Sequence, residues 1–152
     1  MNITIASIGR WNDRAMVELF ERYAARCPWT IALQERVLKK TVPPAELKRA
    51  EAQTLRQALR AADVIIALDE GGRTPTSQSF AGQIGKLRDQ GQRDVCFLIG
   101  GADGLDEELL AEADDRIAFG AMTWPHFLVR VMLAEQLYRA STILAGHPYH
   151  RR

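Results

Sequence analysis

The sequence of 152 residues lacks several features that define particular classes of protein. Its two cysteines, Cys27 and Cys96, lie far apart and form neither a CxxC nor a CxxH pair. No apolar run approaches the roughly 18 residues that span a membrane, and the first ten residues do not resemble a secretory leader. The net charge of +1 at pH 7 indicates no overall preference for an acidic partner. These absences predict a cytoplasmic protein whose cysteines are reduced.

The three histidines do not predict a metal centre. His147 and His150 have nearly ligand-like spacing, but Pro148 between them breaks helical geometry, and no cysteine or carboxylate cluster accompanies them. The sequence also contains no Ser-His-Asp or Cys-His pattern of the kind that marks a covalent nucleophile. We therefore expect no metal.

The composition is typical of a folded protein, with 47% hydrophobic and 26% charged residues. A chain of this length usually forms one domain and buries roughly 70% of its unfolded surface, so no metal or disulfide is needed to stabilise it. We predict a single domain over residues 1–152.

Short segments rich in β-branched and aromatic residues alternate with longer segments of helical spacing. The predicted strands are Ile3–Ile8, Ile31–Val37, Val64–Leu68, Val95–Ile99 and Ile117–Phe119. The predicted helices are Asp13–Ala25, Ala45–Ala61, Thr76–Gln90, Asp106–Ala113 and Pro125–Leu144. This alternation predicts an α/β fold with a mainly parallel central sheet flanked by helices.

The last predicted helix carries an apolar stripe wider than contact with one sheet requires. Pro125 is expected at its first position with Thr123 as the cap, and Gly146 is expected to end it. The wide stripe indicates a second packing partner. Two interpretations are open: a dimer that forms through this helix, or a central helix buried on all sides within one chain.

Charge is distributed unevenly along the chain. From Gln34 to Arg60 there are seven basic residues against three acidic ones, an excess that could attract phosphate. From Gly100 to Asp115 there are seven acidic residues and no lysine or arginine. We expect the two ends of the molecule to carry opposite potentials, although solvated helix faces would give the same pattern.

Loops that follow strand ends are the default place for a ligand in an open α/β sheet. The loop Gly100–Gly104 (GGADG) allows close approach of backbone to ligand, but it matches neither the dinucleotide fingerprint nor the phosphate-binding loop. The segment Phe119–Trp124 is apolar where a solvent-exposed loop would be polar. Either a flat apolar ligand or core packing is expected to cover it.

Several motifs occur in one order along the chain. They are Leu68–Gly72 (LDEGG), Phe97–Leu105 (FLIGGADGL), Met122–His126 (MTWPH), Val129–Val131 (VRV), Glu135–Ala140 (EQLYRA) and His147–Arg151 (HPYHR). Together with the first strand and its following Gly9-Arg10 pair, these motifs resemble the RlmH-type ribosomal RNA methyltransferases of the SPOUT superfamily. The resemblance covers nearly the whole chain and is weakest over Val37–Gln57.

The resemblance implies a SPOUT-type fold in which a trefoil knot occupies about residues 95–152. It implies a homodimer that transfers a methyl group from S-adenosylmethionine to N3 of a pseudouridine in large-subunit (23S) ribosomal RNA, as free RNA or in the assembled ribosome. Because N3 is weakly acidic, a base or a cation near the ring would assist the reaction.

The resemblance also implies two sets of site residues. The cofactor-binding set is Leu68, Gly100, Gly101, Phe119, Gly120, Ala121, Met122, Thr123 and Trp124. The set expected to hold the RNA or take the proton is Arg130, Glu135, Tyr138, Arg139, His147, Tyr149, His150 and Arg151. Glu135 is placed to orient Arg139 across one helical turn. We expect a valine at position 101 to occupy space that the cofactor needs.

The sequence departs from the usual family pattern at Gly120-Ala121, where relatives often have serine followed by lysine or alanine, and at Phe127, where a small residue or proline is common. Two other functions stay open: an RNA-binding domain that keeps the knot without catalysis, and a SPOUT methyltransferase that acts on transfer RNA.

Overall fold

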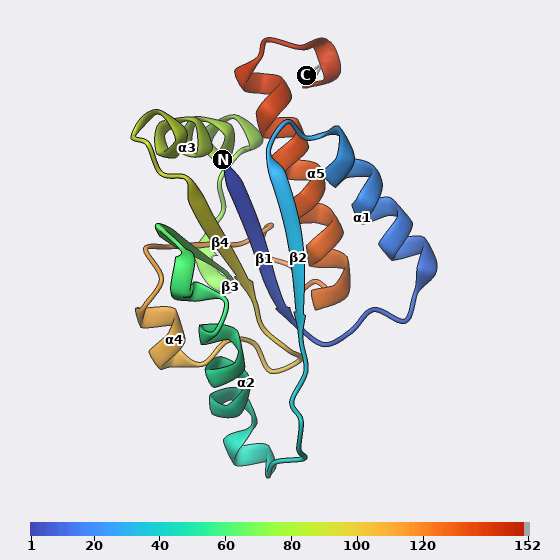
Figure 1. The fold of residues 1–152 in the computed structure, drawn as a ribbon, viewed down its shortest axis with the longest axis vertical. Coiled ribbons are helices and arrows are strands. Elements are labelled where there is room, and N and C mark those ends of the chain that lie inside the picture. The colour runs from blue at the N-terminus through green and yellow to red at the C-terminus, as the bar shows by residue number, and fades with distance from the viewer. Residues whose placement is uncertain (151–152) are drawn as a thin grey trace.

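The computed structural model, which describes residues 1–150, contains one five-stranded sheet in the order β2-β1-β4-β3-β5 (Figure 1). Every neighbouring pair of strands is parallel, as the alternating pattern predicted. The strands are β1 (Asn2–Ile8), β2 (Thr30–Arg36), β3 (Val64–Arg73), β4 (Asp94–Ile99) and β5 (Asp115–Ile117).

Five α-helices and three short 3₁₀ turns connect and follow these strands. The helices are α1 (Arg14–Arg26), α2 (Leu47–Arg56), α3 (Ser77–Asp89), α4 (Glu107–Ala111) and α5 (His126–Leu144). The 3₁₀ turns are Pro44–Glu46, Leu59–Ala61 and Pro148–His150.

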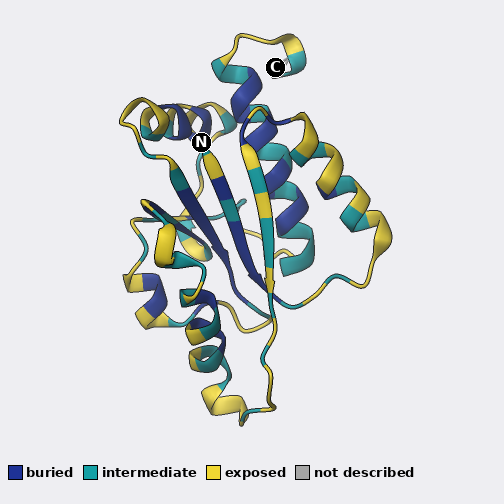
Figure 2. Ribbon diagram, viewed as in Figure 1, coloured by how far each residue is buried: buried dark blue, intermediate teal, exposed yellow. Residues whose placement is uncertain are grey.

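The helices form two layers around the sheet. One apolar cluster joins the sheet to α1, α3 and α5, and a second joins the other face to α2 and α4. Figure 2 shows β1 and β4 buried over most of their length, whereas the edge strand β2 has no buried residue. The hydrophobic runs of β3 and β4 therefore lie in the interior of the sheet, as expected for strands covered on both faces.

Helix α5 lies between α1 and α3, which both pack against it (Figure 1). Its buried residues, such as Val131, Leu133, Leu137 and Ala140, point in several directions around the helix axis. The width of the apolar stripe is thus explained within one chain, so the stripe alone does not require a dimer.

The ends of α5 agree with the sequence prediction in one respect and differ in another. Gly146 follows the helix with φ +66°, a conformation that glycine adopts without strain. Thr123 does not cap the other end, which has no side-chain cap. The Pro125 carbonyl instead accepts hydrogen bonds from the amides of Leu128 and Val129 at 2.9 and 3.1 Å. Backbone hydrogen bonds alone therefore form the first turn of the helix.

Three other predicted boundaries were wrong. The segment Ala45–Ala61 is not one helix, because i→i+3 hydrogen bonds make 3₁₀ turns on both sides of α2. Strand β3 continues to Arg73, since the chain loops out after Leu68 and returns to pair again with Ile117. Strand β5 ends at Ile117 rather than Phe119, and the next amide, of Ala118, donates to the Arg73 carbonyl at 2.9 Å.

The expectation of opposite charge at two ends of the molecule was also wrong. The basic segment and the acidic segment contribute α2 and α4, which pack on the same face of the sheet. Arg56 of α2 forms an ion pair with Glu112 at 2.7 Å, so part of each charge excess neutralises the other.

Candidate cofactor and substrate site

A cavity of about 660 Å³ lies at the carboxyl ends of β3, β4 and β5. Four chain segments form its walls: the end of β3, the glycine loop 100–104, residues 117–124 and the first turn of α5. Ala121 does not line the cavity. Eight of the nine residues that the sequence assigned to a cofactor do so, namely Leu68, Gly100, Gly101, Phe119, Gly120, Met122, Thr123 and Trp124.

The glycine loop is a tight turn that closes on itself. Gly101 and Gly104 form a backbone bridge, with the Gly104 amide donating to the Gly101 carbonyl at 3.2 Å. A Cβ atom at Gly100 would lie 2.6 Å from the backbone of Gly104, which is closer than real Cβ contacts. The loop therefore needs glycine at position 100 to keep this shape.

The expected effect of a side chain at Gly101 has a different physical cause from the one that the sequence suggested. A Cβ atom there would lie 2.8 Å from both carboxylate oxygens of Glu51. A side chain at position 101 would thus collide with Glu51 of α2, behind the loop. It would not project into the cavity.

In the apolar segment Phe119–Trp124, only Phe119 packs against the core, and the other large apolar side chains are exposed. Met122 is 74% exposed and Trp124 is 38% exposed. The indole N–H of Trp124 donates to the Phe119 carbonyl at 3.2 Å, which holds the segment as a closed turn at the cavity wall. Core packing therefore does not account for its composition, and the interpretation as a ligand wall is favoured.

Charged groups around the cavity are mainly acidic. Its lining includes the carboxylates of Asp69, Glu70, Asp103 and Glu107, together with Lys48 and His126. Burial and the neighbouring Arg130 lower the pKa of His126, so its imidazole is neutral at physiological pH. Sequence reasoning missed both Lys48 and His126, because neither stands out from the other charged residues of its segment.

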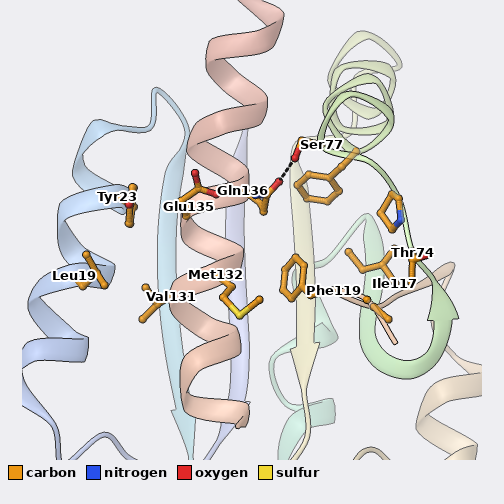
Figure 3. A pocket seen from close by; sticks show the side chains of 14 residues that line it. Leu19, Tyr23, Thr74, Ser77, Ile117, Phe119, Val131, Met132, Glu135 and Gln136 are labelled. Atoms are coloured by element: carbon orange, nitrogen blue, oxygen red, sulfur yellow. Dashed lines mark hydrogen bonds between the residues drawn. The ribbon is translucent and has the colours of Figure 1, made fainter. Parts of the chain in front are cut away.

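A second, more apolar groove of about 540 Å³ is lined by residues of α1, α3 and α5 and by residues 117–120 (Figure 3). Residues 117–120 contribute to the walls of both. Helix α1 provides Leu19 and Tyr23, and α5 provides Val131, Met132 and Glu135. The groove therefore reaches from the cofactor-type cavity toward the C-terminal half of α5.

Four of the residues assigned to RNA binding or proton transfer meet at that half of α5. The Glu135 carboxylate accepts a hydrogen bond from Arg139 Nε at 3.0 Å and another from the Tyr149 hydroxyl at 3.3 Å. The rings of Tyr138 and Tyr149 lie edge to face with centroids 4.7 Å apart. We call Glu135, Tyr138, Arg139 and Tyr149 the α5 cluster.

Two members of the α5 cluster, Arg139 and Tyr149, have shifted pKa values. Burial and the Glu135 carboxylate raise the pKa of the Tyr149 hydroxyl, so this phenol stays protonated near neutral pH. The hydrogen bond to Glu135 raises the pKa of Arg139 further above its ordinary value. Arg26 of α1, which sequence reasoning missed, donates to the Tyr138 hydroxyl at 2.9 Å from 112 positions away.

Arg130 lies apart from the α5 cluster, in the interior. Its side chain is fully buried and donates to the Ser7 hydroxyl at 2.7 Å and to the carbonyls of Ile8 and Gly9 at 2.6 and 2.9 Å. Glu35 of β2 completes this set with an ion pair at 3.1 Å. These contacts join the start of α5 to the end of β1.

The remaining assigned residues belong to the C-terminal segment. His147 is exposed, and its Nδ1 accepts the amide of Tyr149 at 3.2 Å. The side chain of His150 and the whole of Arg151 lie outside the described residues.

Within residues 1–150, no group of three or more histidine, cysteine or acidic side chains is arranged to hold a metal ion. In the same range, no helix is both long enough and apolar enough to cross a membrane. The cysteine thiols of Cys27 and Cys96 are both buried and unpaired with each other.

Comparison with known proteins matches these features to one family. A family model described as predicted SPOUT methyltransferase matches residues 1–150. Ribosomal RNA large subunit methyltransferase H of Rhodospirillum centenum is 50% identical, with 99% of each chain covered. The protein of the same name from Gluconacetobacter diazotrophicus is 49% identical over 97% of this chain and 95% of its own.

Solved structures show the same fold at low sequence identity. A probable methylase family protein from Haemophilus influenzae superposes with a TM-score of 0.63 at 12% identity, covering 99% of this chain and 70% of that one. A putative RNA methyltransferase from Bacillus anthracis gives a TM-score of 0.53 at 14% identity, with 99% of each chain covered. The chain belongs to the SPOUT methyltransferase family.

Proposed function

We propose that this chain uses S-adenosylmethionine to methylate N3 of a pseudouridine in large-subunit ribosomal RNA. The observation that carries the proposal is the cavity of about 660 Å³, whose walls contain eight of the nine residues that the family resemblance assigns to the cofactor. Relatives that are 46–50% identical to this chain over nearly the full length of both sequences bear the name ribosomal RNA large subunit methyltransferase H.

The walls of the cavity fit this methyl donor in shape and charge. Leu68, Ile117 and Phe119 offer an apolar surface of the kind that accepts an adenine ring. The carboxylates of Asp69 and Glu70 suit the cationic sulfonium and ammonium groups of the donor. The glycine loop adds backbone groups that can approach a ligand closely.

Exposed cations of the basic segment Gln34–Arg60 suit a ribonucleic acid partner. Lys39, Lys40 and Arg49 are exposed, and Lys48 of the same segment lines the cavity. Two of the three acids in this segment do not offset them at the surface, because Glu35 pairs with Arg130 and Glu51 is buried. The exposed cations of this segment therefore give it a positive surface, as phosphate binding requires.

The proposed reaction does not require a covalent bond between the protein and its substrates. The donor supplies an electrophilic methyl group, so the protein must mainly align it with a deprotonated N3. In our proposal Arg139 stabilises the anionic ring, and Glu135 holds the Arg139 guanidinium in position. Tyr149, which is only partly buried and packs edge to face on the buried Tyr138, offers an aromatic ring on which an unpaired base can stack. The tail residues His147, His150 and Arg151 add further donors to the RNA.

We infer that two chains form each active site. None of the α5 cluster lines the described cavity, although the apolar groove brings residues 117–120 close to both. A second copy seated along this groove would present its α5 cluster and tail to the first chain's cofactor. We also propose the trefoil knot over about residues 95–152. Its support is the membership of the chain in the SPOUT methyltransferase family.

The test is methyl transfer by the purified protein. Labelled S-adenosylmethionine is incubated with ribosomes and with transfer RNA from a deletion strain, and the products are mapped by mass spectrometry. The proposal predicts label at one pseudouridine of large-subunit RNA. Label in transfer RNA would favour the other methyltransferase function, and absence of donor binding in calorimetry would contradict an enzymatic function.

A further inference from the structure

One acidic side chain of α2 has no role in the function described so far. Glu51 is 8% exposed and is the one acidic residue that is buried among those the structure describes. A buried carboxylate is costly unless other groups compensate for its lost hydration. Within residues 1–150, no lysine or arginine forms an ion pair with it. Its compensation must therefore come from elsewhere.

The group that faces the Glu51 carboxylate is the glycine loop. Both carboxylate oxygens would lie 2.8 Å from a Cβ atom at position 101, and the carboxyl carbon would lie 3.1 Å away. The Gly101 backbone acts to lower the pKa of Glu51 and so favours the ionised carboxylate. Burial and the neighbouring Asp103 act in the opposite direction and raise the pKa of Glu51. The carboxylate thus packs directly on the backbone that forms the cavity wall.

The rest of the loop makes this contact important. The Gly104 amide donates a hydrogen bond to the Gly101 carbonyl, and Gly100 packs against Gly104. The loop is therefore one closed turn. Gly100 and Gly101 line the cavity on one side, and Glu51 contacts Gly101 from the other. A change in the position of the Glu51 carboxylate would therefore change the position of Gly101 and with it the shape of the cavity wall.

We propose that Glu51 is a positioning residue for methyl-donor binding, which acts by holding Gly101 and with it the glycine loop in the shape that the donor recognises. It does not line the cavity itself. This role gives a function to α2, which belongs to the part of the sequence where the family motifs are weakest. The ligand in this inference rests on the proposed function, whereas the loop-holding role does not.

The first test compares three single variants for binding of S-adenosylmethionine by calorimetry. Glu51→Ala removes the contact and should raise Kd at least 10-fold. Glu51→Gln keeps a side-chain oxygen of the same reach and should stay within about 3-fold of the wild type. Gln53→Ala changes an exposed position of the same helix and should leave Kd unchanged. Turnover at saturating donor should fall less than 2-fold in Glu51→Ala, because the residue acts on binding.

The second test uses the crowding between the two residues. Gly101→Ala alone should weaken binding at least 10-fold, because its methyl group meets the Glu51 carboxylate. In the Glu51→Ala background the same methyl group has room, so Gly101→Ala should cost no more than about 2-fold further. An equal cost in both backgrounds would mean that the methyl group collides with the ligand, and it would overturn the proposal.

A third measurement needs no ligand. Amide hydrogen exchange at Gly101 and Gly104 should accelerate at least 10-fold in Glu51→Ala, with Gln53→Ala as the control and exchange in β1 as the reference for global stability. Unchanged loop exchange in Glu51→Ala would overturn the inference. A wild type that binds no donor but shows the accelerated exchange would contradict the proposed function and leave the positioning role supported.

Discussion

The two halves of α5 contain similar side chains in opposite environments. Arg130, in the first half, is fully buried and bonded to β1 and Glu35. Arg139, two and a half turns later, is partly exposed and pairs with Glu135 beside Tyr149. The first half fastens the helix to the sheet, and the second presents polar and aromatic groups at a groove. In our proposal one motif-rich helix therefore contains both structural residues and residues that face the substrate.

The largest effect is expected from removing the tail that packs on the second half of α5. Deleting residues 147–152 should lower methyl transfer at least 100-fold, because Tyr149 and the other groups assigned to the RNA are lost together. The fold should persist, since the tail follows the Gly146 helix end and contributes little to the core. Filter binding of labelled methyl groups measures activity, and thermal unfolding within about 3 °C of the wild type serves as the control.

Replacing each arginine by methionine should separate the two halves. Arg130→Met leaves Glu35 and two backbone carbonyls without their partner and should reduce the free energy of unfolding by about 3 to 5 kcal/mol. Arg139→Met breaks a partly exposed pair and should cost about 1 kcal/mol or less. Urea unfolding measures both. Equal losses would show that the two halves do not differ as described.

Activity should show the reverse order. At a temperature where both variants are folded, Arg139→Met should lose more methyl transfer than Arg130→Met, because Arg139 stabilises the charge on the base in our proposal. A folded Arg130→Met with lower activity than Arg139→Met would instead place Arg130 in the reaction.

A smaller effect on activity is expected from changing the exposed lysines Lys39 and Lys40, which follow β2. The double change Lys39→Glu and Lys40→Glu should raise the KM for RNA about 10-fold and reduce its salt dependence, because two phosphate contacts are lost. Donor affinity should not change. The same charge change at Lys86 and Arg88 of α3 is the control, and an equal effect there would indicate a general charge effect.

The smallest effect concerns two thiols that report on packing. Burial raises the pKa of Cys96, at the centre of the sheet, to about 11. The pKa of Cys27, which contacts Ser141 in the second half of α5, is also raised by burial. Both thiols therefore stay mostly protonated at pH 8 and should react slowly. Cys27, at 9% exposure against 1% for Cys96, should react first with a disulfide reagent. Peptide mapping identifies the order, and faster reaction at Cys96 would contradict the packing.

Much of the fold could be predicted from the sequence, because strands with continuous apolar runs and helices with regular spacing depend on local pattern. The parallel sheet and the cavity at its carboxyl end follow from that pattern. The return of β3 to Ile117 could not be predicted, since it is set by pairing between distant segments. The division around α2 was missed because helical spacing does not distinguish short 3₁₀ turns from the α-helix they flank. The knot cannot be inferred from periodicity and enters through the family resemblance alone.

The site divides in the same way. The glycine loop and the segment Phe119–Trp124 stand out in the sequence because their composition is unusual for loops. Glu51 and Arg26 do not stand out, because each is an ordinary charged residue of a helix whose partner lies 50 or more positions away. The interior position of Arg130 was equally hidden, since an arginine in a helix is usually exposed.

Complementation between two inactive chains tests the shared active site most directly. One chain lacks residues 147–152, and the other carries Gly101→Val, which displaces the glycine loop through Glu51. The two are co-expressed with different affinity tags, and the doubly tagged species is assayed for methyl transfer to ribosomes. The account predicts that each variant alone is inactive and that the heterodimer regains up to about half of the wild-type activity, since one of its two sites has both intact parts. A verified heterodimer without activity would contradict the shared site. It would mean that the cavity and the α5 cluster of the same chain act together.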